Sequence, residues 1–401
     1  MNLLWVKVGG LWPVTTGGRL RSFHILSELS RRHRVTLLTT HGPGDDPDGL
    51  AAALPSCGVV SVPWAPPKQG SVRFGLALGA SWLSALPVDL YRSRVPALGR
   101  LVVRGLARGG VDLVLADFLA ATPNVPLGGE VPAVMFAHNV EHMIWRRLRD
   151  VERRPWRRAL LELEWRKLRR AEARACARAR LTLAVSEADR DRLAVCAPGA
   201  RVSAIPTGVD VDYFAPNGIA EAPGHLVFTG SMDWYPNEDG VLHFVETILP
   251  GIRRELPETA LTVVGRNPSP RLRAAAGRAG VRVTGLVEDV RPFVAEAAVY
   301  VVPLRIGGGT RLKIFEALAM AKPVVSTSVG AEGLPLVPGE HFVRADAPAD
   351  FAGAVVSLLR DPARRRALGD AGRRLVGERY AWPRVAREFE ARCEEVLRHA
   401  C

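Results

Sequence analysis

The feature that most constrains the fold is an alternation of short apolar segments with longer helical patterns, in two successive series. Because strands that alternate with helices form βαβ units around a parallel sheet, the alternation predicts two α/β sheets. A helix is expected at Arg19–Arg32, between the first two strands. Strands are expected at Leu3–Val8, Arg34–Thr39, Val59–Val62, Leu113–Ala116, Ala133–Ala137 and Leu181–Val185, and then at His225–Thr229, Ala260–Val264, Val281–Thr284, Val299–Val302 and Pro323–Thr327.

The two series are separated by a segment rich in turn residues, between Val202 and Pro223. Such composition is typical of a domain boundary. We expect an N-terminal Rossmann-like domain over 1–205, a linker over 206–222 and a second Rossmann-like domain over 223–380. Helical patterns at Ala347–Leu359 and Trp382–His399 close the chain, and the helix within 381–401 is expected to pack back toward the first domain. The predicted fold is two doubly wound α/β domains that face a central cleft.

The chain is strongly basic, which indicates an anionic partner. It has 401 residues, 54 Lys and Arg against 41 Asp and Glu, and a formal net charge of +13. Between residues 146 and 180, 14 basic and 5 acidic residues give a local charge of +9. No recognised nucleic-acid motif accompanies this charge, so nucleic acid is not expected as a partner.

Tryptophans interleave with the arginines of 146–180, at Trp145, Trp156 and Trp165. This pattern suits peripheral contact with an anionic membrane, although a solvated helix pair with internal ion pairs would also explain it. No uninterrupted apolar stretch reaches the length of a membrane span, and the longest candidate, 74–88, is broken by glycine, serine and proline. We therefore expect a cytoplasmic protein, peripheral on the inner face of the membrane, with its five scattered cysteines reduced.

The run 303–327, PLRIGGGTRLKIFEALAMAKPVVST, carries the clearest chemical signal. Three glycines permit close backbone approach, and the start of a helix directs N–H groups and positive potential at an anion. Arg311 and Lys313 add positive charge, while Glu316 can accept hydrogen bonds from hydroxyl groups. The run suits a nucleoside diphosphate sugar, although a surface turn and a Lys313–Glu316 pair at i, i+3 are the plainer alternatives.

Several strings in the chain resemble those of the retaining glycosyltransferases of the GT-B fold, in particular glycosyltransferase family 4. No single string is decisive, but their order and spacing are specific. The strings are the Gly-Gly-Arg loop near 17, HNVE at 138–141, VSEADRDRL at 185–193, IPTGVDVDYF at 205–214, FTGSMDWYPN at 228–237, VVGRNP at 263–268, VTGLVEDVRPF at 283–293 and GGGTRLKIFEALAMAKPVV at 307–325.

The resemblance implies a donor site in the second domain and an acceptor site in the first. Glu316 matches the second glutamate of the family's Glu-x7-Glu motif, which holds the ribose hydroxyls. His138, with Asn139 beside it, matches the position near the transferred sugar, where a strand-end cap or a core histidine is the plainer alternative. Donor-binding positions implied by the resemblance are Gly17, Gly18, Gly230, Gly265, Leu286, Gly308, Gly309, Thr310, Arg311, Lys313 and Glu316.

The chain departs from the family pattern at two places. Gly308 stands where the first glutamate of the motif is expected, and Ser231 follows Gly230 where a phosphate-binding arginine is expected. Arg311 and Lys313 are expected to supply the missing charge, and Asp233 is a weaker candidate for the missing sugar contacts. These departures keep open a non-catalytic GT-B protein that binds anionic glycan or membrane. A GT-B nucleotide-sugar epimerase also stays open, although no convincing extra carboxylates are seen.

The resemblance implies a retaining transferase whose partners are a nucleotide sugar donor and a glycan or lipid-linked acceptor, in cell-surface or exopolysaccharide synthesis. A helix start with two cations can stabilise a departing diphosphate, so no cofactor and no metal are expected. Asp210 and Asp212 form an Asp-x-Asp string but lie in the linker. The sequence leaves the sugar, the nucleotide, the acceptor and the oligomeric state open.

Overall fold

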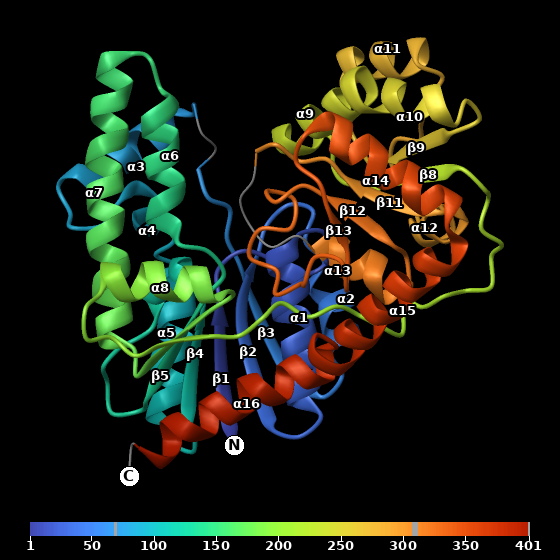
Figure 1. The fold of residues 1–401 in the computed structure, drawn as a ribbon. Helices are drawn as coiled ribbons and strands as arrows, with labels where there is room; N and C mark the ends of the chain where they lie inside the picture. The colour runs from blue at the N-terminus through green and yellow to red at the C-terminus, as the bar shows by residue number, and fades with distance from the viewer. Residues whose placement is uncertain (68–69, 307–311, 400–401) are drawn as a thin grey trace. The chain divides into compact units, whose positions relative to one another are not determined.

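A computed structural model describes residues 1–67, 70–306 and 312–399. The chain divides into two compact units, the first made of Met1–Thr207 with the part of the last helix from Val385 on, and the second of Gly208–Arg384. Each unit is a parallel sheet with helices on its faces, as the alternation predicts (Figure 1).

The first unit is built on a seven-stranded parallel sheet of order β3-β2-β1-β4-β5-β6-β7. Its order reverses between β1 and β4, which is where ligands bind to doubly wound sheets. The strands are β1 (Asn2–Lys7), β2 (Arg34–His41), β3 (Cys57–Pro63), β4 (Leu113–Asp117), β5 (Ala133–Ala137), β6 (Leu181–Ala184) and β7 (Val202–Ala204). The helices are α1 (Gly17–Ser30), α2 (Pro47–Ala53), α3 (Val72–Trp82), α4 (Val88–Arg92), α5 (Pro96–Ala107), η1 (Leu119–Asn124), α6 (Glu141–Val151), α7 (Pro155–Arg178) and α8 (Glu187–Cys196).

The second unit has a six-stranded parallel sheet of order β10-β9-β8-β11-β12-β13, which reverses between β8 and β11. Its strands are β8 (His225–Thr229), β9 (Ala260–Val264), β10 (Arg282–Val283), β11 (Val299–Val302), β12 (Val324–Ser326) and β13 (Val343–Arg344). Its helical segments are α9 (Tyr235–His243), η2 (Phe244–Ile248), α10 (Leu249–Glu255), α11 (Pro270–Arg278), α12 (Arg291–Glu296), α13 (Leu312–Ala319), α14 (Pro348–Arg360) and α15 (Pro362–Arg379).

The last helix, α16 (Trp382–Arg398), packs into the first unit over most of its length. The Phe389 ring stacks on Trp5 of β1 at 5.7 Å between centroids, and Glu390 accepts from Arg32 and pairs with His33. Buried apolar area of this kind is the main driving force for holding a terminal helix in place.

Every expected strand is present, and three elements lie outside the pattern that the sequence analysis described. Strands β7 and β13 were not expected, because each has three residues or fewer and carries little pattern. Helix α15, rich in arginine and glycine, was also not expected. The first helix begins at Gly17 rather than Arg19, because Thr16 accepts a hydrogen bond from the Arg19 amide and thereby caps it. None of the described helices is both long enough and apolar enough to pass through a bilayer.

Candidate functional site

In the second unit, the sheet order reverses beside Gly230, the residue that follows β8. Gly265, which follows β9, packs directly on it: a Cβ added at Gly265 would lie 1.8 Å from the Gly230 carbonyl oxygen. A Cβ added at Gly230 would lie 2.6 Å from the Lys313 amino group. A side chain at Gly265 would collide with backbone, so packing requires glycine there. A side chain at Gly230 would instead displace the amino group of Lys313 and the amide group of Asn237.

Lys313 lies in the first turn of α13 and points over the end of β8. Its amino group donates a 2.8 Å hydrogen bond to the side-chain oxygen of Asn237 and lies 4.2 Å from the centre of the Phe228 ring. Asn237 is buried, and its own amide donates to the Ser231 carbonyl at 2.8 Å. This clamp holds the cation at the switch point of the sheet. Asn237 was not singled out from the sequence, although it lies in the FTGSMDWYPN string.

Glu316 lies one turn further along α13, half-buried behind Lys313. Burial raises the pKa of Glu316 to about 7, and the nearby Lys313 only partly opposes this. Among the described residues its carboxylate accepts no hydrogen bond and forms no ion pair, so the plainer Lys313–Glu316 pair is not formed. A half-buried carboxylate without a donor is a ready acceptor for hydroxyl groups of a ligand.

Other predicted donor residues are less well defined by the structure. Leu286 is 79% exposed in the loop after β10. Gly308, Gly309, Thr310 and Arg311 lie outside the described residues. Asp233 is exposed and accepts from Ser231 and Asn267, and these hydrogen bonds lower the pKa of Asp233.

In the first unit, His138 follows β5 and is 4% exposed. Its Nδ1 atom lies 3.1 Å from the Arg21 guanidinium, and its Nε2 atom lies 2.7 Å from Asp117. Because a guanidinium can only donate, Nδ1 is the acceptor and Nε2 carries the proton. Burial lowers the pKa of His138 to about 3, despite Asp117, so the ring is neutral at pH 7.

Asp117 ends β4, beside the reversal of the first sheet, and is fully buried. Burial alone would raise its pKa, but Lys7 at 3.1 Å and His138 hold the pKa of Asp117 well below its ordinary range. Trp5 donates to the same carboxylate at 3.0 Å. Arg21 also donates to Thr207 at 2.6 Å. The residues Lys7, Arg21 and Asp117 thus form a buried charged network around His138 that the sequence did not reveal.

Gly17 and Gly18 begin α1, the helix that also carries Arg21 of the network around His138. Phe118, with a φ of 70°, stacks on the His138 ring at 3.7 Å, and a Cβ added at Gly18 would lie 2.4 Å from the Phe118 ring. Gly18 is therefore required to admit the aromatic ring. Gly17 is exposed.

Asn139 follows His138 and lies against Glu141 at the start of α6. Burial and the carboxylates of Glu172 and Asp89 raise the pKa of Glu141 to about 7, although Asn139 opposes the shift. The expected contacts of His138 and Asn139 with a sugar stay predictions, and in this structure both ring nitrogens of His138 have protein partners.

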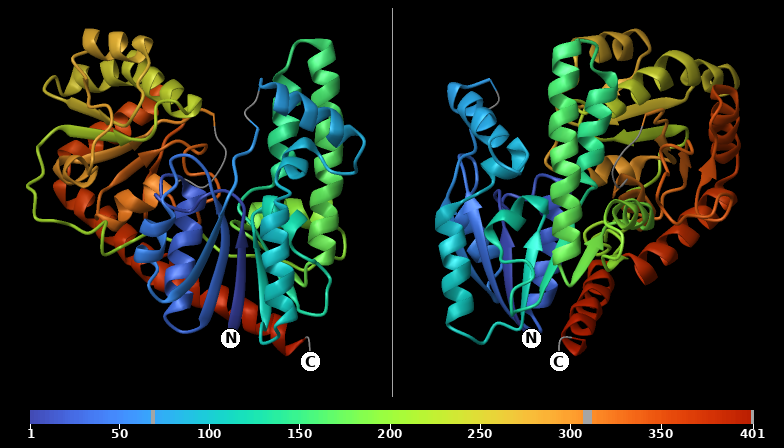
Figure 2. Two further views of the ribbon diagram at one scale, coloured as in Figure 1. Left: turned by 180° about the vertical axis from the view of Figure 1, so that it is seen from behind. Right: turned by 90° about the vertical axis from the view of Figure 1, so that its left-hand side faces the viewer.

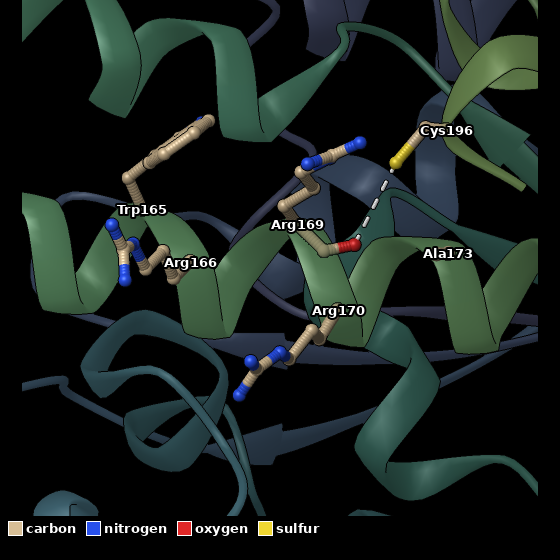
Figure 3. A pocket seen from close by; sticks show the side chains of 6 residues that line it. All are labelled: Trp165, Arg166, Arg169, Arg170, Ala173 and Cys196. Atoms are coloured by element: carbon tan, nitrogen blue, oxygen red, sulfur yellow. Dashed lines mark hydrogen bonds between the residues drawn. The ribbon is translucent and has the colours of Figure 1, made fainter.

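A pocket of about 460 Å³ lies on α7, away from these loops. It is lined by Trp165, Arg166, Arg169, Arg170, Ala173 and Cys196 (Figure 3). The Cys196 thiol lies 3.6 Å from the Arg169 carbonyl oxygen. Its arginines give the pocket a positive potential, but neither the glycines nor Glu316 contribute to it.

Two known family models match most of the chain, one in each half. A family model described as Glycosyltransferase Family 4 matches residues 17–213, and one described as Glycosyl transferases group 1 matches residues 223–361. The boundary between the two matches falls in the turn-rich segment that separates the two predicted domains.

Among curated proteins, the phosphatidyl-myo-inositol mannosyltransferase of Mycobacterium leprae is 32% identical over 203 residues, which cover 48% of this chain and 53% of that protein. The GDP-mannose-dependent alpha-(1-6)-phosphatidylinositol monomannoside mannosyltransferase of Mycolicibacterium smegmatis is 30% identical over 240 residues, 53% of this chain and 60% of that protein. The aligned part thus spans only about half the length of these curated relatives.

Among solved structures, the sucrose-phosphate synthase of Thermosynechococcus elongatus superposes with a TM-score of 0.71 at 15% identity, with 100% of both chains covered. The glycosyltransferase WaaG, described as involved in lipopolysaccharide biosynthesis, superposes with a TM-score of 0.63 at 17% identity over 96% of this chain and 99% of that one. At such identities the likeness establishes the fold alone.

Proposed function

The chain belongs to glycosyltransferase family 4, and on this premise we propose that it is a retaining, metal-independent transferase. It moves a sugar from a nucleoside diphosphate sugar onto a glycan or lipid-linked acceptor. The donor binds to the second unit and the acceptor to the first.

One observation carries the donor assignment: a clamped cation stands at the point where the second sheet reverses, together with a carboxylate that has no hydrogen-bond donor in the described part of the chain. Lys313 is held by Asn237 beside Gly230 and Gly265, two glycines that let a ligand approach the backbone closely. Glu316 follows at the spacing that places a ribose one turn behind the phosphates. A cation in a partly water-excluded site stabilises the charge that develops on a leaving diphosphate.

The state of His138 bears on the mechanism. A neutral ring whose Nδ1 accepts from Arg21 and whose Nε2 donates to Asp117 has no free lone pair for the acceptor's proton. This supports front-face transfer, in which the C–O bond to the leaving phosphate breaks as the acceptor oxygen bonds to the anomeric carbon. The leaving phosphate oxygen takes the acceptor's proton. No protein nucleophile is needed, and the configuration is retained.

The curated relatives suggest where to look for substrates. Their names specify phosphatidylinositol-type acceptors and, for one of them, GDP-mannose. We therefore propose a lipid-linked acceptor, with the protein in peripheral contact with the inner face of the membrane. Synthesis of a cell-surface glycan is the process that fits such an acceptor.

The test is a thermal-shift and calorimetry screen of the full chain against GDP-, UDP-, ADP- and dTDP-sugars. A ligand at about 100 times its dissociation constant stabilises the fold by about 2.7 kcal/mol, so a true donor is easily seen. Lys313→Ala should lower the affinity at least tenfold with little loss of stability, because the side chain is only half-buried and its amino group lies beside Asn237 at the site. A control, Lys322→Ala, should lower the stability instead, since that amino group donates to two buried carbonyls.

Two outcomes would contradict the proposal. If none of these nucleotide sugars stabilises the protein, the donor site is refuted. If one binds but neither transfer nor slow hydrolysis of the sugar follows with any lipid or glycan acceptor, the chain is a non-catalytic binding protein.

A further inference from the structure

Exposed apolar side chains gather on one part of the first unit. Of the 18 large apolar residues that are exposed in the described part of the chain, 8 lie within 72–83 and 144–163. These segments are helix α3 with its cap, helix α6 and the beginning of α7. We call the exposed residues of these segments the α3/α6/α7 face. Helix α3 and the α6–α7 hairpin rise from the same end of the first sheet (Figures 1 and 2).

Helix α3 has an apolar outer side. Val72, Leu76 and Leu83 are 81%, 70% and 94% exposed, and their spacing of four and seven residues aligns them in one stripe. The opposite side packs inward, where the Ser81 carbonyl accepts a 2.6 Å hydrogen bond from Lys167. A helix that covers a solvated protein surface presents polar side chains outward, so this stripe needs a partner that is apolar.

The tip of the α6–α7 hairpin is cationic. Every residue from 153 to 159, RRPWRRA, is exposed, with Trp156 at the centre and the Arg157 guanidinium 5.7 Å from its ring. In the described structure the side chains of Arg153 and Arg158 form no hydrogen bond or ion pair, and the same holds for Arg146 and Arg147 of α6. Trp145 and Trp165 are half-buried, so Trp156 alone of the three tryptophans stands at the surface.

Helix α6 joins the two features. Ile144 and Leu148 are exposed one turn apart, with Arg147 between them on the same side. The partner of this face must therefore offer apolar contact and negative charge together. Nucleic acid offers negative charge but no apolar interior. A neutral protein surface can offer apolar contact but no negative charge.

We propose that the α3/α6/α7 face docks on an anionic lipid bilayer. Helix α3 lies in the plane of the interface with Val72, Leu76 and Leu83 among the acyl chains. The arginines of the hairpin tip contact the headgroup phosphates, and Trp156 lies at the headgroup level. With 11 residues, α3 is too short to cross a bilayer but suits a position on it. This docking rests on the peripheral membrane contact proposed above and names the surface that makes it, but it does not depend on the transfer reaction itself.

The experiment measures the partition of the full chain onto vesicles by sedimentation. Vesicles of phosphatidylcholine alone are compared with vesicles that contain 30% phosphatidylglycerol, chosen as about the anionic fraction that gives a strong surface potential. We expect binding to the anionic vesicles that weakens as salt is raised, because salt screens the arginine–phosphate attraction. Leu76→Ser with Leu83→Ser should lower the partition coefficient at least tenfold at every salt concentration. Arg153→Gln with Arg158→Gln should lower it chiefly at low salt.

Matched controls are taken from exposed positions elsewhere. Val195→Ser, at a residue 76% exposed on α8, and Arg278→Gln on α11 should leave the partition coefficient within twofold of the unchanged protein. Thermal unfolding confirms that each variant is folded. Nucleotide-sugar binding is measured separately. A protein that binds a nucleotide sugar but not the vesicles would refute the docking while leaving the proposed function intact.

Three results would overturn the proposal. The first is that the unchanged protein does not bind to anionic vesicles. The second is that the Leu76→Ser, Leu83→Ser variant binds to them as strongly as the unchanged protein does. The third is a dimer in analytical ultracentrifugation that the same variant dissociates, which would assign the face to a second copy of the chain.

Discussion

Binding of the donor should depend on pH through Glu316. Burial raises the pKa of this carboxyl group to about 7 in the unliganded protein. An ionised carboxylate accepts hydrogen bonds at both oxygens, whereas a protonated carboxyl group must donate one itself. Two ribose hydroxyls therefore favour the ionised form, so donor binding lowers the pKa of Glu316 and releases a proton. At pH 6 about one-tenth of the groups are ionised and at pH 8 about nine-tenths, which predicts an affinity about tenfold higher at pH 8, or about 1.4 kcal/mol.

The assay is isothermal titration calorimetry from pH 5.5 to 8.5 with the nucleotide sugar found by screening. The nucleotide sugar is used rather than the free nucleoside diphosphate, because the terminal phosphate of the latter itself titrates at about pH 6. Repeating the titration at pH 7 in buffers of different ionisation enthalpy counts the protons released. We expect about half a proton for each donor bound.

Glu316→Gln should bind the donor more weakly at pH 8 and show a flat profile. Glu258→Gln, an exposed change at the opposite end of the sheet before β9, should keep the slope of the unchanged protein. The reasoning is refuted if Glu316→Gln keeps the tenfold dependence, or if the unchanged protein binds more tightly at pH 6.

Three further predictions concern the two sheets. Gly265→Ala should destabilise the protein by about 3 kcal/mol in urea denaturation, because the new Cβ would overlap a carbonyl oxygen, whereas Gly277→Ala, with open space around it in α11, should stabilise by about 0.5–1 kcal/mol. Asn237→Leu should weaken donor binding several-fold by releasing the Lys313 amino group, and Asn237→Asp should restore the binding. The neutral His138, with a folded pKa of about 3 against 6.5 when unfolded, gives stability that is full above pH 6.5 and falls as the pH falls toward 3, so His138→Gln should flatten that part of the stability profile.

The local pattern of the chain carried most of the fold. Strands such as His225–Thr229 and Val299–Val302 were located to the residue because they are buried on both faces and read as continuous apolar runs. The shortest strands and α15 were not predicted from the sequence, since β13 has only two residues and α15 carries arginine and glycine where apolar residues of a core-facing stripe are expected. Their positions are decided by contacts with distant segments.

The sequence by itself indicated the class of chemistry, because glycines, cations and a carboxylate near one another along the chain predict a diphosphate site through local geometry. Glu316 and Lys313 could be chosen in this way. Only the tertiary structure decided their state: Asn237, 76 residues before Lys313, clamps the cation, and burial raises the pKa of Glu316. In the same way, the buried network around His138 joins Lys7, Arg21 and Asp117 from three separate segments. Long-range contacts of this kind follow from the order of strands in the sheet, which no local pattern specifies.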